Sequence, residues 1–266
     1  LAMPVVIGEK PPSERFAGAE RNLCIEAMMG NGWALQAGTT HLLSQKFFGD
    51  PANPSTAKVR FTATDGKLTV PFYTSWGVST RLVGALIMVH GDNQGLVLPP
   101  KVAPVHVAIL GLQADRSEEV RKALRLAARL ASGSEEEPVR TGKFLKVTGR
   151  QTVIIDDRVC SLGEKHFYHE KQGTPLRIEI GPKDAEKQQC VVVDRLTGRT
   201  GKAFVPFDQL ASHVAGRLET LQTALYQRAE ENLKARTKPV ATWDELKAGI
   251  ESGNFCRAYL DIYAPG

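Results

Sequence analysis

The run from Tyr73 to Pro104 constrains the fold more than any other part of the chain. It reads YTSWGVSTRLVGALIMVHGDNQGLVLPPKVAP. A polar segment leads into residues that are apolar nearly all round, which predicts a buried helix beginning at Arg81. A Gly-Asp-Asn turn and a Pro-Pro pair follow that helix and indicate a linker to the next part of the chain.

Arg81 is the strongest candidate for chemistry in this run. A permanent cation at the open end of a buried helix needs an anion to meet. Hydroxyl side chains stand just upstream, at Ser75, Ser79 and Thr80. The expected site is cationic, rich in hydroxyls and short of carboxylates, which suits a phosphate chain. The residues alone leave a structural interpretation open, in which Arg81 pairs with a carboxylate such as that of Glu26 or Asp92.

Three separated runs resemble class II aminoacyl-tRNA synthetases, in the form found in prolyl-tRNA synthetases. The run 74–104 resembles the third signature motif of that class. An upstream run resembles the family's segment between its second and third motifs; it reads SERFAGAERNLCIEAMMGNGWALQAGTTHLLSQKF. Two downstream runs resemble the anticodon-binding domain of the same family, namely PVHVAILGL and GTPLRIEIGPKD. The resemblance covers nearly all of the chain, and it implies ATP-dependent activation of proline and its transfer to the proline tRNA.

The resemblance also implies which residues bind ATP. Arg81 would hold the γ-phosphate of a bent ATP, and it is the one residue that we expect to be catalytic. A bidentate guanidinium is better suited to this than a lysine ammonium. Nucleotide contacts are implied at Gln36 and Thr39, and Ser79 and Thr80 are further ATP-binding candidates. Mg²⁺ is expected to enter with ATP, and no residue of the chain is expected to be a metal ligand.

A proline pocket is implied at His41, with Phe16 and Trp76 as apolar walls. Such a pocket should be apolar with few polar groups. Strand alternation predicts that Gln36 faces one side of its strand while Thr39 and His41 face the other. On pattern alone, ordinary packing in the core or at the surface is the favoured explanation of the histidine, and core packing that of both aromatic residues.

The candidates for tRNA contact are basic residues of the downstream part, namely Arg158, Lys165 and Arg177. A charge run of this kind is also typical of a solvated face. The family carries a Gly-x-Lys turn that matches residues 163–165. This chain departs from the family pattern at Glu164, which replaces an aromatic residue, and at 168–171, which replaces a tryptophan-bearing stretch. The fold should survive these changes, while the detailed anticodon contacts should differ.

The expected fold has three parts. Residues 1–103 form part of an α+β antiparallel class II catalytic core, with strands over 22–29 and 33–43, a short helix starting at Ser44 and a hairpin about Asp65-Gly66. Residues 104–206 form an α/β anticodon-binding domain, in which Ser117 caps a helix. Residues 207–266 begin a helical C-terminal domain that the chain cuts short. Its long amphipathic helix runs from Leu210 to Leu233, and the strand FCRAYL has no expected partner.

Bulk properties narrow the class of protein. The net charge of +5 is compatible with a polyanionic partner and does not require one. The cysteines Cys24, Cys160, Cys190 and Cys256 have no CxxC or histidine-paired spacing, which favours reduced thiols in a cytoplasmic protein over a metal site. No apolar run approaches the roughly 20 residues that span a bilayer, so no membrane association is expected.

The chain opens with Leu1 in what resembles the middle of a catalytic domain. We therefore expect a fragment of a longer, homodimeric proline–tRNA ligase that lacks the first two motifs and is inactive by itself. The alternative is a non-catalytic tRNA-binding or regulatory protein related to synthetases. Loss of the set Gln36, Thr39, His41 and Arg81 would have favoured that alternative, and all four are present.

Overall fold

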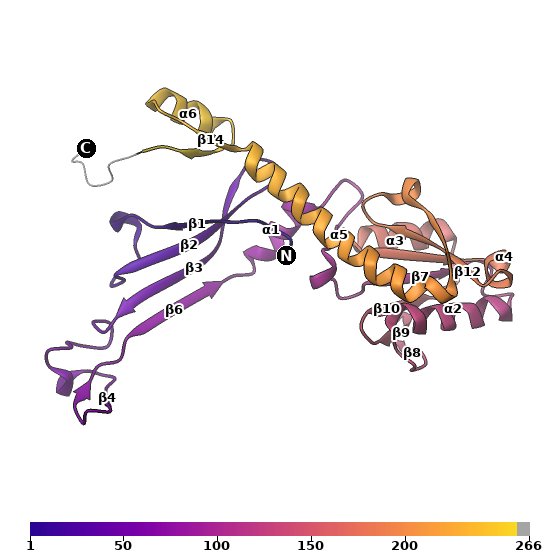
Figure 1. Ribbon diagram of the computed structural model, residues 1–266, viewed down its shortest axis with the longest axis horizontal. Helices are drawn as coiled ribbons and strands as arrows, with labels where there is room; N and C mark the ends of the chain where they lie inside the picture. The colour runs from indigo at the N-terminus through magenta and orange to yellow at the C-terminus, as the bar shows by residue number, and fades with distance from the viewer. Residues whose placement is uncertain (260–266) are drawn as a thin grey trace. The chain divides into compact units, whose positions relative to one another are not determined.

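The computed structural model describes residues 1–259, which form two compact units (Figure 1). The central unit comprises residues 1–2 and 90–229. The N-terminal unit comprises residues 3–89 and the chain from 230 onward. This division differs from the three expected domains, because the first six turns of the last long helix bury their apolar side chains in the central unit.

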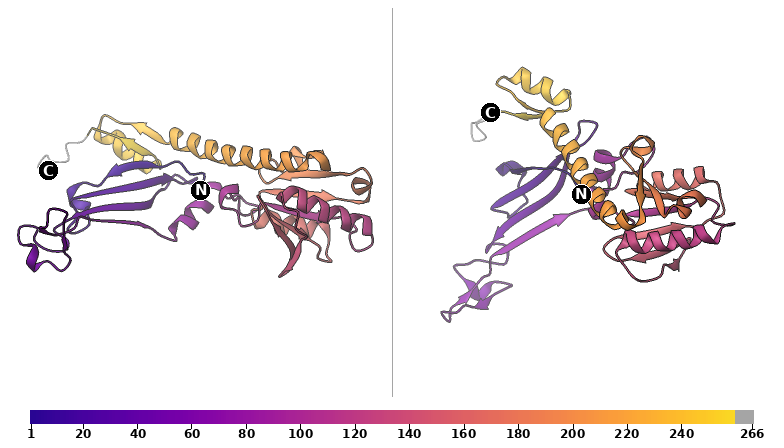
Figure 2. Two further views of the ribbon diagram at one scale, coloured as in Figure 1. Left: turned by 60° about the horizontal axis from the view of Figure 1, so that its bottom comes forward. Right: turned by 45° about the vertical axis from the view of Figure 1, so that its right-hand side comes forward.

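A four-stranded antiparallel sheet forms the N-terminal unit, with the order β1-β2-β3-β6 (Figure 2). The strands are β1 (Val6–Glu9), β2 (Arg21–Met28), β3 (Ala34–Ser44) and β6 (Tyr73–Val78). The turn between β2 and β3 uses Gly32 at a φ of 87°, a left-handed conformation that favours glycine. The two strands predicted from the sequence and the turn between them are confirmed.

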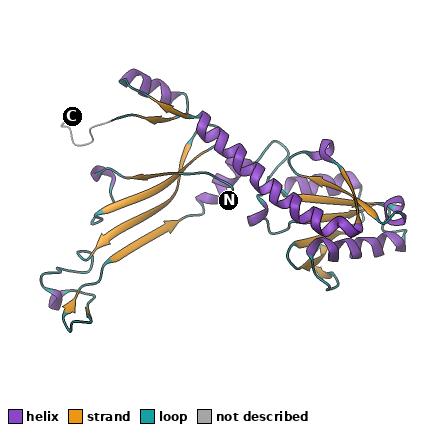
Figure 3. Ribbon diagram, viewed as in Figure 1, coloured by secondary structure: helices purple, strands orange, loops and turns teal. Residues whose placement is uncertain are grey.

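The segment after β3 departs from expectation. Residues 45–49 form a turn instead of the start of a helix (Figure 3). Phe47 and Phe48 both pack on Tyr73 of β6, with ring centroids 5.1 and 5.0 Å apart, and this packing holds the segment against the sheet. The expected hairpin forms but is short, with β4 (Phe61–Thr62) and β5 (Leu68–Thr69).

Helix α1 (Arg81–His90) begins at the predicted residue but is buried on one side only. Ala85 packs with Ala27 and Met29 of the sheet. Val83 and Ile87 are 64% and 45% exposed. The prediction of a helix buried all round is therefore wrong within this chain, since nothing in the described residues covers the outer face of α1.

The C-terminal part adds a small two-stranded sheet. Helix α5 (Phe207–Ala235) is followed by β14 (Thr237–Pro239), α6 (Trp243–Glu251) and β15 (Phe255–Arg257). Thr242 and Glu245 form a capping box at the start of α6. The strand that was expected to lack a partner pairs in parallel with β14.

A mixed seven-stranded sheet, in the order β13-β12-β11-β7-β10-β9-β8, forms the central unit. Its strands are β7 (Val107–Gly111), β8 (Val139–Thr141), β9 (Phe144–Thr148), β10 (Thr152–Asp156), β11 (Leu176–Ile180), β12 (Gln189–Asp194) and β13 (Ala203–Pro206). Its other helices are α2 (Glu118–Ser132), α3 (Leu162–Lys171) and α4 (Pro182–Glu186). Short 3-10 helices span Pro12–Glu14, Pro54–Thr56, Pro100–Val102 and Gly198–Gly201. The sequence analysis missed β8 and β9.

The two faces of this sheet are covered differently. On one face, helices α2, α4 and α5 enclose an apolar core that includes Ile109, Ile155 and Ile178. Ser117 caps α2 as predicted, since its side chain accepts from the backbone N–H of Val120. On the other face, α3 lies over β7, opposite α2 (Figure 1). The parallel pairing of β7 with β10 and β11 brings the carboxyl ends of the three strands to one edge, at the start of α3.

Candidate functional site

The centre of β3 contains a β-bulge that decides which side chains meet. Ile25 of β2 pairs with Gly38, and Glu26 pairs with Gln36, so Ala37 has no partner on β2. An extra residue in one strand reverses the alternation of the side chains beyond it. The side chains of Gln36 and Thr39 consequently lie on one face, where Gln36 Nε2 donates to Thr39 Oγ1. The prediction that Gln36 and Thr39 face opposite sides is wrong, because alternation was assumed to run unbroken.

His41 lies on the same face, two residues beyond Thr39, and packs on Phe16. The two ring centroids are 5.1 Å apart with an interplanar angle of 52°. Asn22 is opposite His41 and 2% exposed. In the amide orientation that satisfies both neighbours, its oxygen accepts from His41 Nδ1 at 2.9 Å and from the Phe16 backbone N–H at 3.0 Å. These contacts hold the Phe16–His41 pair in place.

Arg81 stands at the first turn of α1 and reaches back to the bulge. Its Nη1 donates to the Gln36 carbonyl at 3.2 Å. Its backbone N–H donates to the Ser79 hydroxyl at 3.3 Å. The backbone carbonyls of Ser79 and Thr80 accept hydrogen bonds from the backbone N–H groups of Leu82 and Val83. Within residues 1–259, no carboxylate lies at ion-pair distance from Arg81, so the pairing with Glu26 or Asp92 is not observed.

Asp92 has a different partner. Its two carboxylate oxygens accept from Arg195 at 2.6 and 2.9 Å, and its backbone closes a turn with Gly95. The turn predicted for Asp92 and Asn93 is therefore present. This ion pair also keeps the Asp92 pKa below its ordinary value, mainly through the hydrogen bond from Arg195.

Trp76 does not join the other candidates. It pairs with Thr40, whereas its neighbour Ser75 pairs with His41. Adjacent strand residues point to opposite faces, so Trp76 lies on the reverse side of the sheet from Phe16 and His41. There it is 77% exposed beside Ile7 and Val78, in an open groove of about 440 Å³.

Sequence reasoning missed Asn22 on the candidate face and named Glu26 only as a possible partner of Arg81. Asn22 and Glu26 alternate along β2 with Cys24, and Glu26 is directly opposite Gln36. A carboxylate is thus present on a face that was expected to be short of carboxylates. The pKa of the Cys24 thiol is raised, first by burial and then by the charge of Glu26. The alternation of Asn22, Cys24 and Glu26 was the available signal.

The residues fit a nucleoside triphosphate. The exposed guanidinium of Arg81 has no carboxylate partner in the described residues and is suited to phosphate oxygens. Ser79 and Thr80 add exposed hydroxyls at the start of the helix. The Gln36–Thr39 pair adds donors suited to a nucleoside. Within residues 1–259, no cluster of three or more His, Cys, Asp or Glu side chains is arranged to hold a metal ion. In the same range, no helix is long and apolar enough to cross a membrane.

The three tRNA candidates of the central unit lie around α3. Lys165 is 5% exposed, and its Nζ donates to the Asp156 carbonyl at 3.0 Å. Arg177 is 6% exposed and donates to Glu179 and Glu170 at 3.0 Å each. The interpretation of this charge run as a solvated face is therefore wrong for Lys165 and Arg177. Arg158 keeps 27% of its side chain exposed while it binds Asp156.

Known proteins resemble the chain over nearly all of its length. A family model described as an anticodon binding domain matches residues 106–217. A proline–tRNA ligase of Chloroflexus aggregans is 42% identical over 97% of this chain and 50% of its own length. That of Chlorobaculum tepidum is 41% identical over 98% of this chain and 50% of its own length. The chain thus spans about half the length of the curated relatives it matches.

The solved structures agree with this result. A prolyl-tRNA synthetase of Cryptosporidium parvum, complexed with L-proline and AMP, matches 97% of this chain and 51% of its own. The TM-score is 0.80 at 33% sequence identity. An antiparallel sheet that carries Arg81 and its neighbours, followed by an anticodon-binding domain, is the fold of part of a class II aminoacyl-tRNA synthetase. Within that class, the chain is similar to prolyl-tRNA synthetases, over nearly all of its own length and about half of theirs.

Proposed function

We propose that this chain provides part of the catalytic core and the anticodon-binding domain of a proline–tRNA ligase. The observation that carries the proposal is the environment of Arg81. Its guanidinium is exposed, has no carboxylate partner within residues 1–259 and is tied to the bulge that brings Gln36 and Thr39 together. A guanidinium left free in this way is suited to a phosphate of the substrate.

Each residue of the face then has a role in adenylate formation. Arg81 binds the γ-phosphate and stabilises charge that develops as pyrophosphate leaves. Ser79 and Thr80 offer hydroxyls to the same phosphate chain, and Gln36 and Thr39 orient the nucleoside. Catalysis on this view is positioning and charge stabilisation, since no side chain of the face is placed as a nucleophile.

Phe16 and His41 form the proline side of the site. Their stacked rings give an apolar surface for a small ring, and the hydrogen bond from His41 Nδ1 to Asn22 fixes the imidazole orientation. Trp76 is left out of this pocket because it lies on the reverse face.

ATP supplies the adenylyl group that activates the proline carboxylate, and Mg²⁺ enters with the phosphates. The AMP in the Cryptosporidium parvum relative supports the nucleotide assignment. The proline tRNA is the second substrate. Residues 104–206, within which most of the matched anticodon-binding family lies, would bind it through Arg158 at the surface. Lys165 and Arg177 would act from beneath that surface.

The whole enzyme is proposed to be a cytoplasmic homodimer. Four free cysteines, of which Cys24 and Cys190 are buried, support a reducing compartment. The exposed apolar groove beside Trp76 is of the kind that a further part of such an enzyme covers.

Substitution at Arg81 tests the proposal. A chimera would be made in which this chain replaces the matching half of the Chloroflexus aggregans ligase. Arg81→Lys should lower proline-dependent ATP–pyrophosphate exchange by about 100-fold, because a point charge replaces a planar fork. Exchange in the chimera within about threefold of the unsubstituted value would contradict the role of Arg81.

Arg21→Lys is the matched control. Arg21 is an exposed arginine of the same sheet, paired with Glu9 at 2.9 Å, and its substitution should leave exchange unchanged. A chimera that folds and binds proline tRNA, yet shows no exchange before any substitution, would favour the alternative of a non-catalytic tRNA-binding protein. No observation at present favours that alternative.

A further inference from the structure

Helix α3 is joined to its sheet by ionisable side chains, where a helix and a sheet usually meet through apolar ones. From the helix come Lys165, His166 and His169, and from the strands come Asp156 and Glu179. Asp156 is fully buried and His169 is 2% exposed. Buried charges are costly unless geometry and hydrogen bonds satisfy them, so this arrangement must be specified closely.

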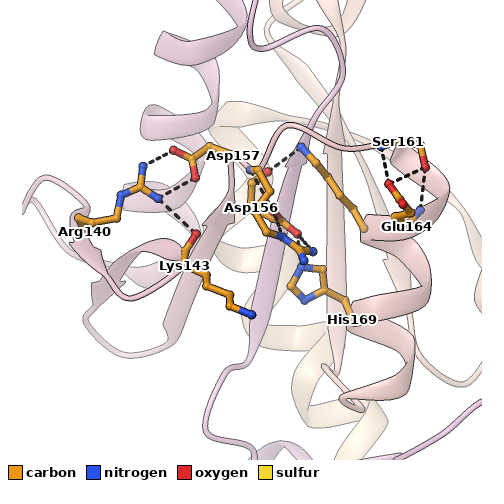
Figure 4. Close-up of polar contacts among 9 residues, drawn as sticks. Arg140, Lys143, Asp156, Asp157, Ser161, Glu164 and His169 are labelled. Carbon is orange, nitrogen blue, oxygen red and sulfur yellow. Dashed lines mark hydrogen bonds and ion pairs between the residues drawn. The ribbon is translucent and has the colours of Figure 1, made fainter.

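Asp156 is the centre of the arrangement (Figure 4). Its carboxylate accepts from Arg158 Nε at 2.8 Å and Nη2 at 2.6 Å, and from His169 Nε2 at 2.9 Å. Its carbonyl accepts from Lys165 Nζ at 3.0 Å. Burial by itself would raise the Asp156 pKa, but the hydrogen bonds from Arg158 and His169 outweigh burial and hold that pKa below its ordinary value.

Arg158 is the one member of this group that reaches the surface. Its guanidinium carbon lies 4.4 Å from the centroid of the Tyr168 ring and 5.4 Å from that of Phe144. Asp156 occupies its Nε and Nη2. In the described part of the chain, no acceptor is bonded to its Nη1. The guanidinium is thus held over an aromatic ring with one nitrogen available to an external acceptor.

His169 cannot reach such an acceptor itself. His169 is 2% exposed, and the centroid of its ring lies 5.7 Å from that of Phe144. Its Nε2 donates to the Asp156 carboxylate. Lys165 is buried in the same way and touches the main chain of Asp156. Their hydrogen bonds therefore connect them to a ligand at Arg158 through Asp156, while the His169 ring also contacts the Phe144 and Tyr168 rings beside Arg158.

We propose that His169 and Lys165 are positioning residues that act through Asp156 to fix the guanidinium of Arg158 toward bound tRNA. The proposal rests on the proposed function, in which Arg158 contacts the tRNA. In this arrangement His169 fixes one carboxylate oxygen, Lys165 fixes the peptide that carries the carboxylate, and Arg158 is left with a single orientation. Preorganisation of this kind lowers the cost of binding.

A double-substitution cycle on the 266-residue chain tests the proposal, with an in vitro transcript of proline tRNA as the probe. His169→Phe keeps the ring bulk and removes the donor to Asp156. It should weaken tRNA binding about fivefold in the wild-type background and less than about twofold in an Arg158→Gln background. Equal losses in both backgrounds would overturn the proposal, because a purely structural role gives additive effects.

Two further variants keep the test decisive. His169→Gln retains an N–H donor and should bind within about twofold of wild type, whereas a loss as large as that of His169→Phe would count against the hydrogen bond to Asp156. Should circular dichroism show that His169→Phe is unfolded, Lys165→Met takes its place in the same cycle. It carries the same expectation of a loss that disappears with Arg158→Gln.

His213→Phe is the matched control, since His213 lies on α5, which packs on the opposite face of the sheet. It should not change binding. The experiment distinguishes failure of the proposed tRNA binding from failure of the proposed positioning role. No binding of the transcript by the wild-type chain would overturn the tRNA-binding role of this domain. Binding that Arg158→Gln weakens, but with no coupling to His169 or Lys165, would overturn the positioning role alone.

Discussion

Arginines of this chain differ in what they touch, and the difference separates structural from functional candidates. Arg195 is bound by Asp92 through both carboxylate oxygens, and Arg217 is bound by Asp194. Arg177 lies between Glu170 and Glu179. Within residues 1–259, the guanidinium of Arg81 donates only to a main-chain carbonyl. A fixed guanidinium with unused donors is ready to bind a planar or tetrahedral anion.

At the residue scale, His41 provides a test of the proline pocket. His41→Ala removes the ring that stacks on Phe16. In the chimera with the Chloroflexus aggregans ligase, the KM for proline should rise about tenfold, since a small pocket contact contributes roughly 1–3 kcal/mol. The KM for ATP should change much less. Both would be measured by pyrophosphate exchange.

Thr40→Ala is the control for this prediction, because Thr40 is adjacent in sequence but points to the reverse face with Trp76. It should leave both constants near the wild-type values. A larger rise in the KM for ATP than for proline in His41→Ala would mean that His41 belongs to the nucleotide side of the site.

At the scale of the element, the bulge in β3 determines the candidate face. If Ala37 were paired in regular alternation, Gln36 and Thr39 would be three residues apart in an unbroken strand and would face opposite sides. The bulge also leaves the Gln36 carbonyl where Arg81 Nη1 can reach it. One inserted residue therefore couples β3 to the start of α1.

Deletion of Ala37 should remove the bulge, and with it the placement of the Gln36 carbonyl that Arg81 contacts, while keeping the antiparallel pairing of β2 and β3 and leaving Gln36 and Thr39 on one face. We expect the chimera with the deletion to lose exchange activity by about 100-fold, because small misplacements of positioning groups have effects of this size. Pyrophosphate exchange measures the loss and circular dichroism checks the fold. Retention of full activity by a folded deletion variant would show that the bulge is not required.

The contact between helix α3 and the sheet should lose stability in acid. Burial would raise the pKa of Glu179, but the hydrogen bond and charge of His166, with the charge of Arg177, lower it to about 2 from an ordinary 4.5. A carboxyl with a depressed folded pKa stabilises the fold above its unfolded pKa, and this stabilisation is lost as the pH falls. Asp156 acts in the same direction.

The free energy of unfolding of the central unit should therefore fall as the pH decreases from about 4.5 to about 2. Glu179 would account for about 3 kcal/mol of the change. Urea titrations followed by circular dichroism at several pH values measure it. Glu179→Gln should flatten this dependence, whereas Glu186→Gln, at an exposed position of α4, should not. An unchanged slope in Glu179→Gln would contradict the prediction.

At the scale of the whole molecule, the two units differ in their cores. The central unit has one continuous apolar core that joins α2, α4 and α5 to the sheet. The N-terminal unit has a small buried cluster around Ala27, Met29 and Ala85, and its sheet exposes Ile7, Trp76 and Val78. Because the N-terminal unit has few buried apolar contacts, we expect its local stability to be lower than that of the central unit.

Limited proteolysis of the 266-residue chain should reflect this difference. The first cleavages are expected between residues 45 and 58, where turns and exposed side chains predominate, and a fragment close to residues 90–229 should persist. Mass spectrometry of the products over time measures this, with the urea-unfolded chain as the control. Persistence of residues 3–89 after the loss of 90–229 would reverse the assignment of the stable unit.

Local patterns were sufficient for much of this protein. Apolar periodicity and turn residues predicted β2, β3, α1, α2 and α5, and side-chain chemistry with family motifs identified Arg81, Gln36, Thr39, His41 and Phe16 as candidates. These features depend on neighbours within a few residues along the chain. Helix caps such as Ser117 and the turn at Asp92 are of the same kind, since a side chain there bonds its own backbone.

The remaining features depend on pairings between distant segments. The bulge at Ala37 exists because of the register between β2 and β3, and the same register puts Trp76 on the reverse face from His41. Lys165 and Arg177 read as surface charges, yet the crossing of α3 over the sheet buries them among carboxylates. The sequence by itself determined the class of fold and the chemistry available, whereas tertiary register and packing decided which of those side chains share a surface.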